Sequence, residues 1–320
     1  MKEKCAEQVN SFTNILVMVK IYPINNISDY NADNDHKTLN PLVSVIDFSK
    51  VKMREWGNVD SIKFQYGMYC IYLKDVKCGD MKYGRHYYDY QAGTLVFCAP
   101  GQVSEFEKPA EPYQPKGYGL IFHADLLLGT HLGKSIRTHK FFDYESNEAL
   151  HLSDDERKII LNCLAKIEYE INQPIDKHSK KLITSNIELF LDYCQRFYDR
   201  QFITREHVNN GILEQFQTLL NDYFQTNKPN QLGLPSVNYC AEALHLSANY
   251  FGDLIKKSTG RSALDHIHDK IIELAKARIF EDDKNVNQIA MELGFKYPQH
   301  FTRLFKQQVG HTPKEYRNLN

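Results

Sequence analysis

The sequence is most tightly constrained by a degenerate internal repeat in its C-terminal region. The segment that begins at Val237 aligns with the segment that begins at Val286 at a shift of 49 residues, and one extra residue in the second copy then makes the shift 50. Self-similarity at a fixed spacing indicates repeated supersecondary units. We therefore expect this region to contain the same small helical unit twice.

Each copy carries the physical marks of a helix-turn-helix. Its first helix has an alanine, Ala241 or Ala290, at the point where a second helix must cross closely. The turn of the second copy contains Gly294, which can adopt a positive φ because it has no Cβ atom. The following helix begins at Ser247, a good N-cap, or near Pro298, which suits the first helical turn.

The second helix of each unit should bury one face and expose the other. The expected units are residues 236–259, with Phe251, Leu254 and Ile255 facing inward, and residues 286–309, with Phe301, Leu304 and Phe305 facing inward. Residues 262–280 are expected to form one long helix that holds the two units at a fixed distance. Two recognition helices about 34 Å apart would enter successive major grooves of DNA.

Three motifs follow one another in the second copy. They are Ile289-Ala290-x-x-Leu293-Gly294-Phe295, Phe301-x-Arg303-x-Phe305-Lys306 and Gly310-x-Thr312-Pro313-x-x-Tyr316-Arg317. Their order and spacing resemble the signature of the AraC/XylS family of transcription activators, and the resemblance covers residues 230–320. It implies a sequence-specific regulator, expected to be an activator, that binds double-stranded DNA and acts with RNA polymerase.

The resemblance also implies which residues contact DNA, because residues at the start of each recognition helix read base edges in that family. Gln299 and Arg303 suit this role, since an amide pairs with adenine and a guanidinium with guanine. Gly252 and Asp253 stand where larger or basic residues are usual, and an aspartate faces phosphates badly. We therefore expect the second unit to dominate, or the first to read DNA unusually. The candidate DNA-binding residues are Asn249, Tyr250, Asp253, Lys256, Tyr297, Gln299, His300, Thr302, Arg303 and Lys306.

The distribution of charged residues also favours the second unit as the main DNA-binding element. The whole chain has a formal net charge of −1, so any basic surface for nucleic acid must be local. Residues 296–317 contain one acidic residue, Glu315, against five basic ones. These are Lys296, Arg303, Lys306, Lys314 and Arg317. Without the repeat, a solvated basic face would explain them as well.

The rest of the chain predicts an α+β multidomain protein. Short segments rich in aromatic and branched residues occur between residues 40 and 125, separated by Gly/Pro turns, which favours a small sandwich or barrel. From Ser153, which begins a capping box with Glu156, two amphipathic helices follow, and they could pack on the sheet or form a homodimer. The expected divisions are a sensor domain (1–150), a helical dimerisation or connector region (151–227) and the DNA-binding domain (228–320), with a linker at 227–235.

The N-terminal region also resembles a cupin-like β-barrel, which implies a sensor of a small molecule or a partner. Residues 93–103 look like the second cupin motif, but Gln102 stands where metal-dependent cupins place a histidine. His86 lacks the usual paired histidine and His123 lies in an apolar strand, so we expect no metal, no cofactor and no catalytic residue. Four tyrosines could line a pocket or simply pack: Tyr83, Tyr87, Tyr88 and Tyr90.

Two alternatives to a regulator are a cupin-type enzyme fused to a DNA anchor and an architectural DNA-binding protein. Architectural proteins use apolar wedges or strong positive charge, and the chain shows neither. The seven cysteines form no Cys-x-x-Cys pair, which favours reduced thiols. The apolar run at 15–19 is too short for a signal peptide or a membrane span, so a cytoplasmic protein without membrane contact is expected.

Overall fold

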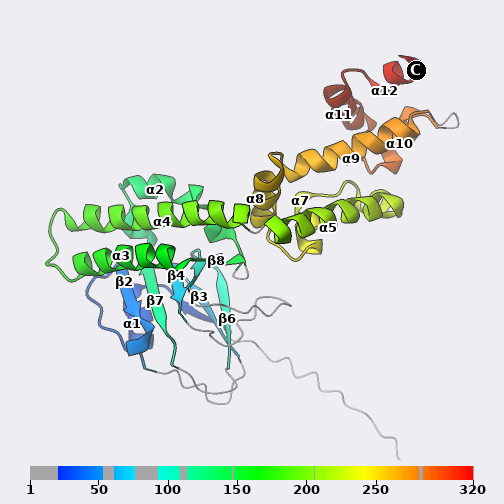
Figure 1. The fold of residues 1–320 in the computed structure, drawn as a ribbon. Helices are drawn as coiled ribbons and strands as arrows, with labels where there is room; N and C mark the ends of the chain where they lie inside the picture. The colour runs from blue at the N-terminus through cyan, green and yellow to red at the C-terminus, as the bar shows by residue number, and fades with distance from the viewer. Residues whose placement is uncertain are drawn as a thin grey trace, which may run out of the picture.

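The structure, a computed structural model, describes residues 21–52, 61–75, 93–108, 114–145, 148–204, 206–280 and 284–319. It has two lobes (Figure 1). The N-terminal lobe, up to residue 204, holds two β-sheets with helices on one side, and the C-terminal lobe, from residue 206, is entirely helical in its described part. This confirms the expected α+β organisation with a helical C-terminal region.

The N-terminal lobe contains a larger and a smaller sheet. The larger sheet has the strand order β2-β7-β4-β5-β8 and the smaller one the order β1-β3-β6. The strands are β1 (Ile21–Ile24), β2 (Val43–Asp47), β3 (Ser61–Tyr66), β4 (Tyr69–Lys74), β5 (Thr94–Cys98), β6 (Val103–Glu107), β7 (Gly117–Phe122) and β8 (Leu150–His151). Three of the short segments between residues 40 and 125 that are rich in aromatic and branched residues form β4, β5 and β7.

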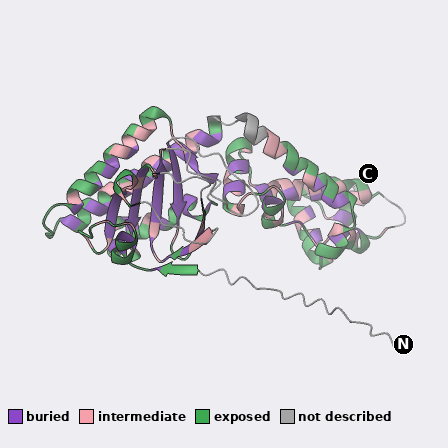
Figure 2. Cartoon of the chain, turned by 90° about the horizontal axis from the view of Figure 1, so that it is seen from below, coloured by how far each residue is buried: buried purple, intermediate pink, exposed green. Residues whose placement is uncertain are grey.

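The larger sheet is buried on both faces, as Figure 2 shows. In β4, Cys70 and Tyr72 belong to the core between the two sheets, whereas Ile71 and Leu73 belong to the core under the helices. This alternation follows from the two-residue period of a strand. Helix α1 (Ile27–Asp33) closes the first core, where the Tyr30 hydroxyl donates a hydrogen bond to Tyr72 Oη at 3.1 Å.

Helices α3 (Asp154–Ile171) and α4 (Ser179–Thr204) pack on the larger sheet and on each other. The expected capping box is present: the Ser153 hydroxyl accepts from the backbone N–H of Glu156, and the Glu156 carboxylate accepts from that of Ser153. Arg157 makes a two-pronged ion pair with Asp75, which ties α3 to the end of β4. The helix pair therefore packs on the sheet, which is one of the two packing partners expected for it.

Short helices complete the N-terminal lobe between the strands and the helix pair. They are η1 (Phe48–Lys50), η2 (Ala124–Leu127), α2 (His131–Ser135), η3 (Ile136–Thr138) and η4 (Lys140–Asp143). The segment from η4 to β8 matters most here, because it faces the C-terminal lobe and contacts α8.

The C-terminal lobe is built from eight helices in the described residues. They are α5 (Glu206–Gln225), α6 (Lys228–Leu232), α7 (Val237–Ala243), α8 (Ala248–Thr259), α9 (Ala263–Arg278), α10 (Val286–Glu292), α11 (Pro298–Val309) and α12 (Pro313–Leu319). The stretch expected to be a linker contains α6, which contacts α10. Helix α5 packs on α8, with the Phe216 and Phe251 ring centroids 5.1 Å apart.

Candidate nucleic-acid interface

The repeat forms two helix-turn-helix units, α7–α8 and α10–α11. Ala241 and Ala290 are completely buried where the paired helices cross, as expected from the sequence. Gly294 has a φ of +94°, in the region that favours glycine. At the equivalent turn of the first unit stands His245, with a φ of +58°. Both turns therefore have a positive φ at this position, although only the second uses glycine.

Both recognition helices begin and end at the predicted residues. The Ser247 hydroxyl caps α8 by accepting from the backbone N–H of Tyr250, and Pro298 occupies the first turn of α11. Gly260 and Gly310 end the two helices in the left-handed conformation. Of the residues predicted to face inward, Phe251, Leu254, Ile255, Phe301 and Phe305 are inaccessible to solvent. Leu304 is only partly buried and packs against the same core.

Helix α9 joins the units and carries the expected apolar stripe, with Ile267, Ile271 and Ala275 buried. The Arg317 guanidinium donates from Nε to the carbonyl oxygen of Ile279 at 2.6 Å and from Nη2 to that of Lys284 at 2.9 Å. Arg317 therefore satisfies backbone carbonyls after the end of α9. Arg317, one of the five basic residues of the segment 296–317, therefore has a structural role for its guanidinium.

In the second unit, α11 presents an open polar face. Thr302 is half-buried, and the other candidates of this unit are exposed: Tyr297, Gln299, His300, Arg303 and Lys306. Arg303 makes no hydrogen bond or ion pair with any residue that the structure describes. A purely structural pairing with Glu292 is excluded in this conformation, because the Glu292 carboxylate accepts from Lys284 Nζ at 2.9 Å and from Arg278 Nη1 at 3.5 Å.

In the first unit, the four candidates divide between two sides of α8. Asn249 and Lys256 are exposed. Tyr250 is 7% exposed, and Asp253 is only partly accessible. A side chain added at Gly252 would meet nothing within 4 Å, so the side of α8 that carries Asn249, Gly252 and Lys256 is open.

Comparisons with known proteins agree with this geometry. The model of a helix-turn-helix domain family matches residues 240–319. The HTH-type transcriptional regulator YobQ of Bacillus subtilis is 32% identical over 83 residues, which are 26% of this chain and 34% of YobQ. The regulator YfiF of the same organism is 28% identical over 141 residues, which are 44% of this chain and 41% of YfiF. The chain thus matches between a third and half of these relatives' length.

Among solved structures, the C-terminal domain of the response regulator yesN from Fusobacterium nucleatum is 27% identical. That alignment covers 32% of this chain and 95% of the solved domain, with a TM-score of 0.29. The family match falls on the two units just described. The C-terminal region is an AraC-type helix-turn-helix domain.

The first recognition helix of this AraC-type domain is held by the N-terminal lobe. The Asp253 carboxylate accepts from Lys140 Nζ at 3.0 Å and from the Tyr144 hydroxyl at 2.8 Å. The Tyr144 ring also lies edge-on to the Tyr250 ring, with the centroids 5.3 Å apart. Burial and the neighbouring Asp253 charge raise the pKa of Tyr144 far above its usual value, so this hydroxyl stays a donor.

The N-terminus of α8 is also covered by the N-terminal lobe. The Glu148 carboxylate accepts from the backbone N–H of Ser247 at 2.6 Å and from its hydroxyl at 2.5 Å. Burial raises the pKa of Glu148 to about 7, against the opposing effect of its hydrogen bonds with Ser247 and Glu145. Sequence reasoning missed Lys140, Tyr144 and Glu148. The one available signal was Asp253, an acid at a position expected to face DNA.

In the segment that resembles the second cupin motif, Gln102 makes hydrogen bonds to the backbone of the protein itself. Gln102 Oε1 accepts from the backbone N–H of Ala99 at 2.8 Å, and Gln102 Nε2 donates to the Phe142 carbonyl oxygen at 3.1 Å. His123 was expected within an apolar strand, but it directly follows the end of β7 and caps η2 by accepting from the backbone N–H of Asp125. His86 and the four clustered tyrosines lie outside the described residues.

Two general searches of the described residues complete this survey. No group of three or more His, Cys, Asp or Glu side chains there could hold a metal ion. No helix within the described ranges is long and apolar enough to cross a membrane.

Proposed function

We propose that the whole chain is a sequence-specific, double-stranded DNA-binding regulator of transcription. The open polar face of α11 carries the proposal, because it presents an amide, a guanidinium and an ammonium in a row on a rigid helix with a buried apolar back. Gln299 and Arg303 would read base edges, and Lys306 would contact phosphate. Proteins of this kind act in the cytoplasm, where the chain would meet RNA polymerase, with activation as the expected outcome.

The direct test is enrichment of duplexes from a random-sequence library by the full-length protein. Enrichment of one motif supports sequence-specific binding. Binding without any enriched motif would instead indicate an architectural protein, and no binding at low salt would refute the proposal. Low salt is the fair condition, because phosphate contacts weaken as salt rises.

We further propose that the N-terminal lobe is a cupin-like sensor whose small-molecule effector or partner changes DNA binding. Two packed sheets with a helical layer are compatible with that role. Gln102 bonds to protein groups on both sides, which favours a sensor over a metal-dependent enzyme. Elemental analysis of the purified protein tests this point, and stoichiometric iron, zinc or manganese would contradict it.

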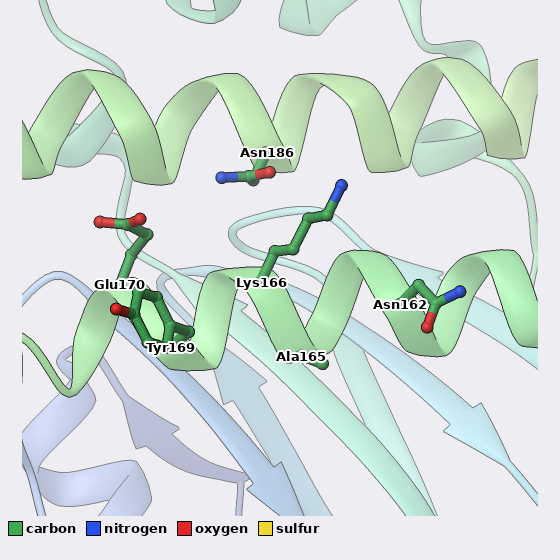
Figure 3. Close-up of a pocket in the computed structure, with 6 residues that line it drawn as sticks. All are labelled: Asn162, Ala165, Lys166, Tyr169, Glu170 and Asn186. Atoms are coloured by element: carbon green, nitrogen blue, oxygen red, sulfur yellow. The ribbon is translucent and has the colours of Figure 1, made fainter.

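Helices α3 and α4 are the proposed surface for a homodimer. Their outer side is apolar at Tyr169, Leu182 and Leu189, which are 64%, 44% and 40% exposed. Figure 3 shows an open hollow between the two helices, lined by Asn162, Ala165, Lys166, Tyr169, Glu170 and Asn186. Side chains from a second copy would fill a surface of this shape, and most soluble oligomers are symmetric dimers.

Sedimentation of the full-length chain tests the dimer. Wild type is expected to sediment as a dimer at micromolar concentration, and Leu182→Glu as a monomer. Leu232→Glu is the matched control, because Leu232 is an exposed leucine of α6, which lies in the other lobe. A wild-type monomer at high micromolar concentration would remove this proposal and leave DNA binding untouched.

The packing also indicates where the DNA-binding unit begins. Phe216 of α5 packs on Phe251 of α8, and the Tyr223 hydroxyl of α5 donates to the carbonyl oxygen of Gly233 at 2.9 Å. We therefore propose to count α5 with the DNA-binding unit, which places the boundary near residue 205 instead of 227.

A further inference from the structure

Helix α8 carries two adjacent stripes of side chains. The open stripe, Asn249, Gly252 and Lys256, follows the three- and four-residue spacing of one helix face. The second stripe, which we call the docked stripe, lies beside it. Each of its members contacts the N-terminal lobe: Ser247, Tyr250, Asp253 and Lys257.

The docked stripe is held mainly by one short segment of the N-terminal lobe, in and after η4. We call Lys140, Tyr144 and Glu148 the latch. Lys140 and Tyr144 donate hydrogen bonds to the Asp253 carboxylate of α8. The Glu148 carboxylate accepts hydrogen bonds from Ser247 at the N-terminus of the same helix. A further ion pair, between Lys257 Nζ and the Asp199 carboxylate of α4 at 2.9 Å, extends the contact.

The Glu148 carboxylate occupies a position that suits a DNA phosphate. The N-terminus of a helix binds anions through its free N–H groups and its dipole. Phosphates of DNA are frequently held there when a recognition helix enters the groove. Glu148 is 4% exposed and bonds to both the amide and the hydroxyl of Ser247, so a carboxyl group of the protein already occupies this end of α8.

The latch also accounts for an acid at a base-reading position. In the repeat, Asp253 corresponds to Arg303 of α11. A free carboxylate there would be repelled by phosphates. Against the latch it is bonded by Lys140 and Tyr144, so its charge is matched by the protein itself.

We propose that the N-terminal lobe and DNA bind the docked stripe of α8 in alternation. The major groove is about 12 Å wide and a helix with its side chains is about 10–12 Å across. A helix in the groove therefore has no space for a second protein surface along its flank. The first unit enters DNA only when the latch releases it, whereas α11 is open throughout. This inference rests on the proposed DNA-binding function.

The first test is the affinity of the full-length protein for the duplex that wild type enriches from a random library. Tyr144→Phe removes one bond to Asp253 without changing any charge, and it is expected to bind about three- to tenfold more tightly. Tyr22→Phe is the matched control, because Tyr22 is an exposed tyrosine of β1 that belongs neither to the latch nor to the proposed dimer surface, and it should bind like wild type. Equal or weaker binding by a folded Tyr144→Phe protein would overturn the inference.

Lys140→Ala gives a second variant that does not depend on the packing of Tyr144, because the Lys140 side chain is 59% exposed. Loss of a positive charge by itself weakens binding to DNA. Latch release acts in the opposite direction, so tighter binding by Lys140→Ala supports the inference and weaker binding contradicts it.

The second test measures the latch itself in the wild-type chain. Zero-length carbodiimide coupling should join Lys140 to Asp253, whose charged atoms lie 3.0 Å apart, and mass spectrometry should detect the product. Saturating duplex is expected to suppress this cross-link. The pair Lys158–Asp155 within α3 is the internal control, and its cross-link should persist. An unchanged 140–253 yield on DNA would overturn the inference.

Different results would contradict the proposed DNA-binding function and the proposed alternation at α8. If neither wild type nor any variant binds duplex, the proposed function is wrong and the alternation falls with it. If wild type binds and enriches a motif while Tyr144→Phe is no tighter and the 140–253 cross-link survives saturating duplex, only the alternation is wrong.

Discussion

Tyr250 of the first recognition helix is 7% exposed, whereas His300, its counterpart in the second, is open to solvent. Asp253 has two partners in the N-terminal lobe, whereas its counterpart Arg303 has none in the described residues. The two recognition helices have the same length, and each ends at a glycine in the left-handed conformation. Their difference teaches that one helix-turn-helix scaffold can serve protein docking in one copy and remain available to DNA in the other.

The largest expected difference between the two units is in the free energy of unfolding when the turn residues Gly294 and His245 are replaced. A Cβ at Gly294 would lie 2.7 Å from the carbonyl carbon and oxygen of Gly233, at a φ that is already strained for other residues. Gly294→Ala should lower the free energy of unfolding by about 3 kcal/mol. His245→Gly, at the equivalent turn, should change it by about 1 kcal/mol or less. Denaturant unfolding of both variants measures this, and equal losses would show that the turns are equivalent after all.

The next comparison separates Arg303 from Asp253 in DNA binding. Arg303→Ala should weaken specific binding about ten- to a hundredfold and relax the preference at one base pair, because a bidentate contact to guanine is worth about 1–3 kcal/mol. The melting temperature should not change, since Arg303 has no hydrogen-bond or ion-pair partner among the residues that the structure describes. Asp253→Ala should relax no base preference. Titrations against single-base variants of the enriched duplex decide, and an unchanged preference in Arg303→Ala would remove its assigned role.

Smaller effects on DNA binding are expected from Lys256 and Lys306, which occupy equivalent positions in the two recognition helices. Lys306→Ala should weaken binding to all sequences alike, by about two- to fivefold, and lower the slope of affinity against salt by about one. Lys256→Ala should cost less, because the first unit must leave the latch before it reaches DNA. Salt titrations of the two variants test this order. A larger loss from Lys256→Ala would mean that the first unit leads binding.

The smallest expected effect is a pH dependence of the first unit alone. The pKa of Glu148 is raised to about 7 by burial, which outweighs the opposing hydrogen bonds from Ser247 and from the backbone N–H of Glu145. The folded chain therefore binds an extra proton between about pH 4.5 and 7. The stability from this group is full below that range and is lost as the pH rises through 7.

The melting temperature of wild type relative to Glu148→Gln measures this dependence. The melting temperature of wild type should fall relative to that of Glu148→Gln as the pH rises from about 5 to 8, and the difference should then level off. A difference that grows in favour of wild type with rising pH would show that the carboxylate form is the one stabilised at α8.

Much of the DNA-binding unit was predictable because its signals are local. Ser247, Pro298, Gly260 and Gly310 mark helix ends through backbone chemistry that operates within a few residues, and the structure has the helices end there. The stripe of Ile267, Ile271 and Ala275 follows from the helical period alone. The capping box at Ser153 is equally local.

The sequence by itself therefore determined the two units, their buried faces and the order of a β-rich region before a helical one. Only the tertiary structure decided that Asp253 meets Lys140 and Tyr144, which lie 113 and 109 residues earlier, and that α6 occupies the expected linker. Contacts between residues so far apart depend on how the two lobes meet. No local pattern encodes that arrangement, because each partner looks like an ordinary surface residue until the other lobe covers it.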